Sequence, residues 1–161
     1  MFNMKKQKTN VMRVLEQKKI NYTPHEYPHG DAPVDGVTVA ALTGMPAERV
    51  FKTLVAVGAS KQHYVFDIPV ERELDLKKAA KAVGEKSVAM VHVSEITPLT
   101  GYVRGGCSPI GMKKQFRTVF DESVNTLETV CVSGGKIGTQ VELAPADLLR
   151  LTGADTAELT I

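Results

Sequence analysis

The sequence has little cysteine, no long apolar run and almost no excess of charge. Only Cys107 and Cys131 are present, far apart and without a Cys-x-x-Cys pair, which excludes a disulfide framework and favours reduced thiols in the cytoplasm. No segment approaches membrane-spanning length, and residues 1–10 carry lysines where a secretory signal has an apolar core. We therefore expect a cytoplasmic protein that does not contact the membrane.

The charge balance limits which partners the chain can bind. Twenty Lys and Arg against 18 Asp and Glu give a net charge of +2, too small for a protein that coats DNA or RNA nonspecifically, so contact with a polyanion should be confined to a local basic rim. A hydrophobic content of 43% with 24% charged residues excludes disorder as the main state. The length of 161 residues predicts one domain over 1–161.

Apolar periodicity and end signals predict about four helices. In chain order these are a helix capped by Asn10, a helix from Thr38 to Gly44, a helix over 74–83 that Gly84 ends, and a helix from Pro145 to Gly153.

β-favouring runs separated by glycine-rich or proline-rich turns predict the strands. Residues 50–57 and 63–70 form the expected hairpin, and Ser94 should cap a turn that ends at Pro98. The other expected strands are 20–22, 88–93, 116–120, 129–133, 139–143 and a last one through Leu159. This order predicts an α+β fold: a mixed, largely antiparallel, barrel-like sheet of about six or seven strands flanked by about four helices.

Motifs of several familiar chemistries are missing. His25 and His29 have the i, i+4 spacing of metal ligands on a helix, but prolines beside both break that helix. Residues 106–113 have the glycine spacing of a phosphate-binding loop, yet Met112 stands where the motif needs lysine. There is no Gly-x-Ser-x-Gly elbow. We expect no metal and no cofactor.

Glycine-rich segments, a cysteine and one lysine remain as candidate functional residues. The glycine-rich segments 101–111 and 133–135 can expose backbone N–H groups to a phosphate or an acyl oxygen, although either can be a plain turn. Cys107 is a candidate nucleophile, but free cysteines are more often small buried hydrophobes. Lys52 interrupts an otherwise apolar strand, so its charge must reach either solvent or an anion in a cleft.

Several segments together resemble one family. They are FKTL (51–54), LKKAAK (76–81), TGYVRGGCSPIG (100–111), KK (113–114), VSGGKIG (132–138) and ELAPADL (142–148). In this order they are similar to the YbaK/EbsC-type Cys-tRNA(Pro) deacylases, which are related to the editing domain of bacterial prolyl-tRNA synthetases. The resemblance implies hydrolysis of the ester that joins a mischarged amino acid to the terminal adenosine of tRNA(Pro).

The resemblance also implies roles for individual residues. Lys52 would be the central catalytic lysine, and Gly105 would lie near the acyl group with backbone donors that form an oxyanion hole. The residues implied to bind substrate are Tyr27, Thr53, Gly106, Ser133 and Gly134. Two positions depart from the family pattern and bear on substrate selectivity: Asp35 stands where relatives often have an aromatic residue, and Gln140 stands where some have an acidic one.

In the mechanism proposed for the family, the cysteinyl thiol of the substrate attacks its own ester carbonyl, so the protein needs no nucleophile. The implied partners are the acceptor end of tRNA(Pro) and prolyl-tRNA synthetase. A basic rim for the acceptor stem would comprise Lys77, Lys78, Lys81, Lys113, Lys114 and Arg117. The alternatives are an Ala-tRNA(Pro) deacylase that uses water, and a noncatalytic module that binds aminoacyl-tRNA or a synthetase.

Overall fold

The computed structural model describes residues 8–161; residues 1–7, with Lys5 and Lys6, lie outside the described part. The elements, in chain order, are α1 (Asn10–Gln17), β1 (Tyr22–Glu26), α2 (Gly36–Thr43), the short 3₁₀ helix η1 (Ala47–Arg49), β2 (Phe51–Gly58), β3 (His63–Pro69), α3 (Leu76–Val83), β4 (Val88–Met90), α4 (Val93–Thr100), β5 (Arg117–Asp121), η2 (Glu122–Thr126), β6 (Val130–Ser133), β7 (Thr139–Leu143), α5 (Pro145–Thr152) and β8 (Asp155–Ala157).

The strands form two sheets. One has the order β4-β2-β3-β5-β8 and the other the order β1-β7-β6. The β3–β5 and β5–β8 pairs are parallel, whereas the other pairs of the described chain are antiparallel. The predicted α+β class with a mixed sheet is therefore confirmed.

The strands do not form the barrel-like sheet that the sequence predicts. The two sheets meet at a backbone bridge between Val50 and Cys131, and within the described residues β2 and β6 form no ladder beyond it. One edge of β2 pairs with β3 along its length, but the other edge pairs with β4 only from Ala56 onward. The sequence also predicts too few elements, because the described residues form eight strands and five α-helices.

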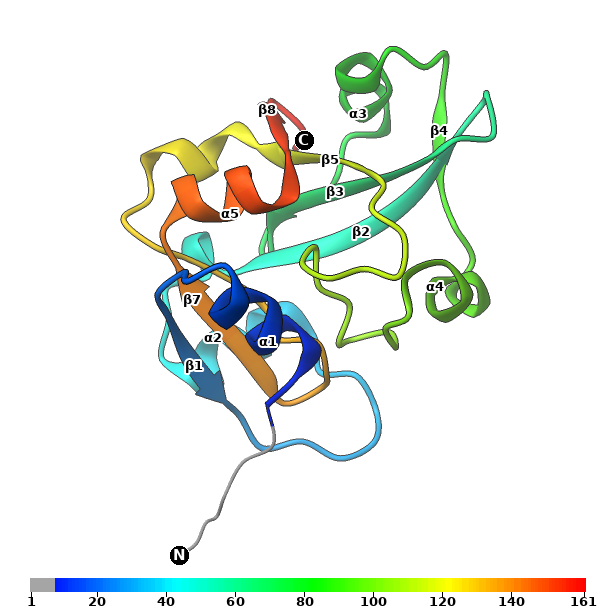
Figure 1. Ribbon diagram of the computed structural model, residues 1–161. Coiled ribbons are helices and arrows are strands. Elements are labelled where there is room, and N and C mark those ends of the chain that lie inside the picture. Colours follow the sequence, from blue (N-terminus) through cyan, green and yellow to red (C-terminus); the bar gives the residue numbers. More distant parts are fainter. Residues whose placement is uncertain (1–7) are drawn as a thin grey trace, which may run out of the picture.

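The core explains how the sheets are held together. The largest apolar cluster joins Leu15 of α1 and Leu148 of α5 to Phe51, Val65 and residues of β6 and β7, so it fills the space between the two sheets. On the other face of the five-stranded sheet, α3 packs through Ala79, Ala80 and Val83. In Figure 1, β2 and β3 cross the middle of the molecule, with α3 above them, β4 at their right end, α4 below them at the right, and α1, β1 and β7 at the lower left.

The helices end at the glycines predicted from the sequence, but two of them begin at other N-cap residues than those predicted. The helices α2, α3 and α5 end at left-handed Gly44, Gly84 and Gly153, as predicted. The cap of α2 is Asp35 instead of Thr38, because the Asp35 carboxylate accepts the Thr38 N–H bond at 2.9 Å and starts the helix earlier.

The first helix is likewise capped by its neighbour, Thr9, whose side chain accepts a bond from the Met12 N–H. Asn10, the predicted cap, lies inside the helix and donates to the Gly111 carbonyl instead, at 3.1 Å. The start of the chain is thereby fastened to the glycine-rich segment 101–111.

Two prolines lie inside elements where a break was expected. Pro24 belongs to β1, an edge strand that pairs with β7 alone, and edge strands are where a sheet tolerates proline. Pro98 lies within α4, where a turn ending at that residue was expected. Since Ser94 is exposed, solvent can reach the part of α4 where the proline removes a hydrogen bond.

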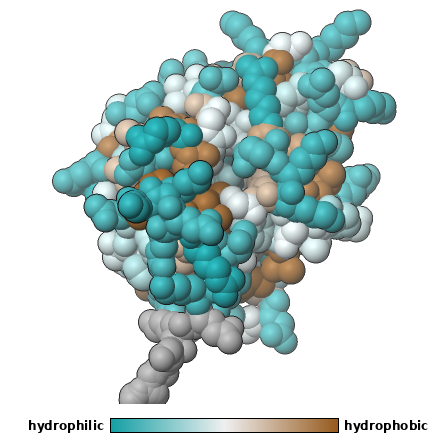
Figure 2. All heavy atoms as spheres, viewed as in Figure 1, coloured by the Kyte–Doolittle hydropathy of each residue, from teal (hydrophilic) through white to brown (hydrophobic). Residues whose placement is uncertain are grey.

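No helix in residues 8–161 has the length and apolar character needed to cross a bilayer. The face seen in Figure 2 is mainly hydrophilic, with several separate hydrophobic areas.

Candidate active site

A cavity of about 240 Å³ opens beside the edge of β2 that carries no partner strand. Its wall is formed by Val50 and residues 51–55 of β2, by Met90, Val91 and Ile96 of the β4–α4 region, and by Arg104, Gly105 and Cys107 of the glycine-rich segment. Tyr27, Ser133 and Gln140 are among the residues that complete it.

The open strand edge explains why successive residues share this cavity. The N–H of Val91 donates to the Val55 carbonyl at 3.1 Å, and this bond marks where β4 begins to cover β2. Lys52 and Thr53 point to opposite faces of the sheet, because side chains alternate along a strand. Both line the cavity because it lies at the edge, where both faces are reached.

The cationic groups that line the cavity are Lys52 and Arg104. Lys52 is half-buried and Arg104 is exposed, and neither forms an ion pair or a hydrogen bond within residues 8–161. No Asp, Glu or His of the described chain lines the same wall. The cavity is therefore electropositive and fits an anionic group.

A buried carboxyl group lies directly behind this wall. Thr53 is paired with Asp67 across the β2–β3 ladder, and its hydroxyl donates to Asp67 Oδ1 at 2.5 Å. Asp67 has no exposed surface, and its Oδ2 has no partner among the described residues. Burial raises the pKa of Asp67 to about 8, partly offset by the Thr53 bond, so the carboxyl is mainly protonated at neutral pH.

The glycine-rich segment reaches the cavity through close backbone packing. Gly105 has φ of +87°, and a Cβ there would lie 2.8 Å from Pro33 Cβ. Next to it, a Cβ at Gly106 would lie 2.8 Å from Lys136 Cα. Only glycine fits both positions without displacing a neighbouring segment.

Ser133 connects this segment to β6. Its hydroxyl donates to the Gly106 carbonyl at 2.9 Å and accepts a bond from the Gly135 N–H at 3.2 Å. A Cβ at Gly134 would lie 2.6 Å from Thr139 Cγ2, so the β6–β7 turn is also closely packed. The Ser133 hydroxyl is therefore engaged with backbone on both sides.

The structure brings together most of the residues singled out from the sequence. Lys52, Thr53, Tyr27, Gly105 and Ser133 all line the cavity. Gly106 and Gly134 do not line it, but each lies beside a residue that does, and each allows a close backbone approach.

The six residues of the predicted basic rim do not line the cavity. Lys78 pairs with Glu158 at 2.6 Å, and Arg117 pairs with Asp155 at 3.5 Å. Lys113 donates to the Pro98 carbonyl at 3.4 Å, at the end of α4. Their contact with tRNA stays a prediction.

The two positions that depart from the family pattern lie in different surroundings. Asp35 caps α2, and the backbone and hydroxyl of Thr38, which donate to it, lower the pKa of its carboxyl. Gln140 lines the cavity, is 7% exposed and has an Oε1 without a partner in the described chain. Gln140 therefore offers the cavity an unused acceptor.

Sequence reasoning missed Arg104 and Asp67. Arg104 lies within the quoted segment 100–111, where a cation beside two glycines was the available signal. Asp67 is the only charged residue of β3 apart from the titratable His63 at its start, so the rule that selected Lys52 could have selected it as well.

Cys107 is half-buried in the cavity wall, where burial raises the pKa of its thiol to about 12. It is therefore protonated at neutral pH. The donor set that could hold a metal lies elsewhere on the same sheet as Gln140, in His25, Cys131 and Glu142.

Comparison with known proteins decides the family. Residues 34–151, which include all of these cavity-lining positions except Tyr27, match the model of the aminoacyl-tRNA editing domain. The chain belongs to the aminoacyl-tRNA editing domain family.

Relatives of this editing domain include a protein of similar length and a synthetase. The chain is 47% identical over 154 residues to the "Putative Cys-tRNA(Pro)/Cys-tRNA(Cys) deacylase EbsC" of Enterococcus faecalis, covering 96% of this chain and 94% of that protein. It is 27% identical over 109 residues to the proline–tRNA ligase of Lactobacillus gasseri, covering 68% of this chain but 19% of the ligase.

The editing-domain fold also recurs in solved structures. One is described as the "Crystal structure of a putative trans-editing enzyme for prolyl tRNA synthetase"; it shares 28% identity and a TM-score of 0.81 over 94% of this chain and 95% of that one. These matches confirm the family resemblance carried by the sequence motifs.

Proposed function

We propose that this editing domain acts in trans and deacylates Cys-tRNA(Pro). One observation carries the proposal: Lys52 and Arg104 share a small cavity with Gly105, and that wall has no carboxylate and no histidine among the described residues. An electropositive pocket of about 240 Å³ is smaller than the roughly 300–1,000 Å³ of pockets for drug-sized ligands. It suits one amino acid at the end of an anionic chain.

Each wall of the cavity has a part in holding this substrate. Lys52 and Arg104 bind the phosphate of the terminal nucleotide, since both are cations without a protein partner. The backbone at Gly105 donates to the acyl oxygen as negative charge develops on it. The free Oε1 of Gln140 accepts a hydrogen bond from the α-ammonium group of the amino acid.

The cavity supplies no activated nucleophile of its own. The Cys107 thiol is protonated, and the hydroxyls of Ser133 and Thr53 already donate to the Gly106 carbonyl and to Asp67. In the proposed reaction the cysteinyl thiolate of the substrate attacks its own carbonyl carbon. A C–S bond forms, the C–O bond to the ribose breaks, and the ribose oxygen takes up a proton. Water then hydrolyses the cyclic thioester to cysteine.

The comparisons support the choice of tRNA. The Enterococcus relative is named for Cys-tRNA(Pro) and Cys-tRNA(Cys), and the ligase and the trans-editing protein both concern prolyl-tRNA synthetase. With a net charge of only +2, the chain has little electrostatic attraction for a whole tRNA. We therefore propose that prolyl-tRNA synthetase delivers the tRNA.

The test is deacylation of Cys-tRNA(Pro) by Lys52→Ala beside a matched lysine variant. Lys52→Ala should lower kcat/KM about a hundredfold, the scale of removing one preorganised charge contact. Lys86→Ala, at an exposed site outside this cavity, should match the wild type. Wild-type turnover by folded Lys52→Ala would show that Lys52 is not part of the site. If the wild type binds aminoacylated tRNA but does not accelerate release of the amino acid, the noncatalytic module is favoured.

A further inference from the structure

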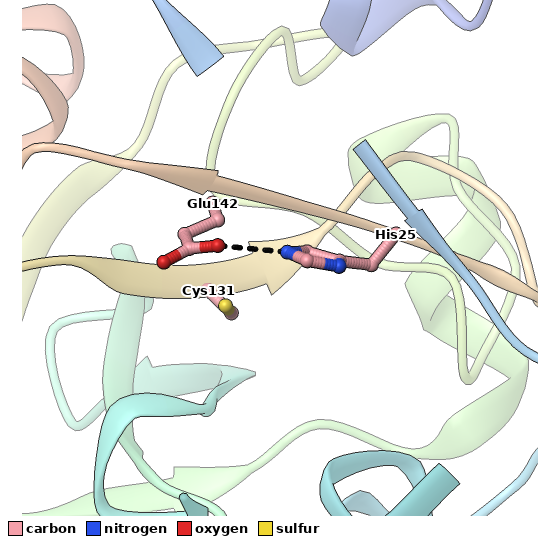
Figure 3. Close-up of side chains that lie close together, drawn as sticks. All are labelled: His25, Cys131 and Glu142. Carbon is pink, nitrogen blue, oxygen red and sulfur yellow. Dashed lines mark hydrogen bonds and ion pairs between the residues drawn. The ribbon is translucent and has the colours of Figure 1, made fainter. Parts of the chain in front are cut away.

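A second cluster of reactive side chains lies next to the cavity and has no part in the proposed reaction. His25 Nε2 lies 2.8 Å from Glu142 Oε1, and the donor atoms of His25, Cys131 and Glu142 all lie within 4.8 Å of one another. Figure 3 shows the Cys131 side chain close to the paired imidazole and carboxylate. Within residues 8–161 this is the one group of three such donors.

The register of the three-stranded sheet brings His25, Cys131 and Glu142 together. Cys131 of β6 is directly opposite Glu142 of β7, and His25 of β1 is opposite Gln140 on the other edge of β7. Alternation along the strands puts all four on one face of the sheet. The cluster lies two residues, about 7 Å, from the Ser133–Gln140 pair that lines the cavity. Three adjacent strands therefore hold the donors at fixed positions.

The chemistry of the three donors is selective. An imidazole nitrogen, a thiolate sulfur and a carboxylate oxygen are the ligand types of Zn²⁺, and three protein ligands with water in the fourth position is a common zinc arrangement. Zinc bonds of about 2.0–2.3 Å require ligand atoms separated by roughly 3–4 Å, which small side-chain rotations can reach from the present spacing. The side chains of His25 and Glu142 are 23% and 19% exposed, so an ion can enter.

Thr129 supports the ligand Glu142, whereas the nearby cation Arg49 would repel a metal ion. The Thr129 hydroxyl donates to Glu142 Oε2 at 2.5 Å, leaving Oε1 for an ion. Arg49 lies near, 3.4 Å from the Thr129 hydroxyl, but it is paired with Glu128 at 3.6 Å. The alternative use of Cys131 as a nucleophile is disfavoured, because the thiol is buried and its pKa is raised to about 12.

We propose that His25, Cys131 and Glu142 form a site for a single Zn²⁺ ion. On binding, the thiol of Cys131 releases its proton to solvent, and the imidazole of His25 takes the tautomer protonated at Nδ1, so that Nε2 is free. Sulfur, nitrogen and oxygen then each donate an electron pair to the metal, and water completes the coordination. The ion cross-links β1 to β6 and β7 beside the acyl cavity. This inference does not depend on the deacylase reaction.

The test is metal binding by the full chain after chelator treatment. Zn²⁺ titrated by calorimetry should bind one per chain, and Co²⁺ used as a spectroscopic probe should give the charge-transfer absorption of a cobalt–thiolate bond. Cys131→Ser should abolish that absorption. His25→Gln and Glu142→Gln, at partly exposed positions, should each weaken Zn²⁺ binding at least tenfold.

Cys107→Ser is the matched control, because Cys107 is the other cysteine and belongs to the cavity. It should bind Zn²⁺ like the wild type. The proposal is overturned if the wild type takes up no stoichiometric Zn²⁺, if the cobalt–thiolate absorption depends on Cys107, or if His25→Gln and Glu142→Gln bind as tightly as the wild type.

Discussion

The Ser133 hydroxyl donates a hydrogen bond to the carbonyl of Gly106, 27 residues earlier in the chain. This bond joins the glycine-rich segment to the end of β6. It also fixes the backbone next to Gly105, which lines the cavity. The shape of the cavity thus depends on a contact between two segments distant in sequence.

Replacing Ser133 with Ala should therefore affect both stability and activity. A buried carbonyl loses its partner, which costs about 1–3 kcal/mol of unfolding free energy. Deacylation should fall mainly through kcat as the Gly105 backbone shifts. The matched control is Ser123→Ala, whose hydroxyl is buried without a partner among the described residues and should cost nothing. Equal effects of the two variants in denaturant titrations would contradict this role for Ser133.

Gly105→Ala should lower deacylation more than stability alone explains. Alanine at φ +87° costs roughly 1–2 kcal/mol, and its Cβ would also lie 2.8 Å from Pro33, displacing the segment. Gly44→Ala, at φ +74° with nothing within 4 Å of the added Cβ, incurs the backbone cost without the contact. Activity measured below both melting transitions should be lost in Gly105→Ala and kept in Gly44→Ala. Loss in both, or in neither, would contradict this account.

Asp67→Asn should change how stability depends on pH. Burial raises the pKa of Asp67 to about 8 in the folded chain, whereas in the unfolded chain it ionises near 4. Between these values the folded state holds more protons, so its stability falls as pH rises, by up to about 1.4 kcal/mol per pH unit for one proton. The asparagine variant should lose less stability from pH 5 to pH 8 in denaturant titrations. Parallel pH profiles for variant and wild type would show that Asp67 is ionised when folded.

Cys107→Ala should leave deacylation of Cys-tRNA(Pro) within about twofold of the wild type. Burial raises the pKa of this thiol to about 12, so it is not a thiolate at neutral pH. Single-turnover rates with the folded variant provide the measurement. Complete loss of activity without unfolding would instead identify a nucleophile in the protein.

Local signals in the sequence predicted much of the fold. They did not predict how strands far apart in the chain pair with one another. Gly44, Gly84 and Gly153 end their helices where expected, since a left-handed residue after a helix is a local requirement. Whether β2 would close onto β6 depends on contacts between residues far apart in the chain, such as Val50 with Cys131, 81 residues apart, which no local pattern encodes. The barrel-like expectation was not confirmed for this reason.

The candidate site, like the fold, could be predicted from the sequence only in part. Lys52 was predictable because a charge in an apolar strand needs a partner or a cleft. Its neighbour in the cavity, Arg104, lies in an exposed turn, where charges are ordinary. The meeting of His25 with Glu142 follows from strand register across 117 residues, so sequence spacing could not reveal it.

The most direct measurement compares hydrolysis of cysteinyl-, alanyl- and seryl-tRNA(Pro) by the same enzyme preparation. If the substrate thiol is the nucleophile, cysteinyl-tRNA(Pro) should react far faster than the other two, although serine differs from cysteine by one atom. Comparable rates for alanyl-tRNA(Pro) would contradict the account and identify water as the nucleophile.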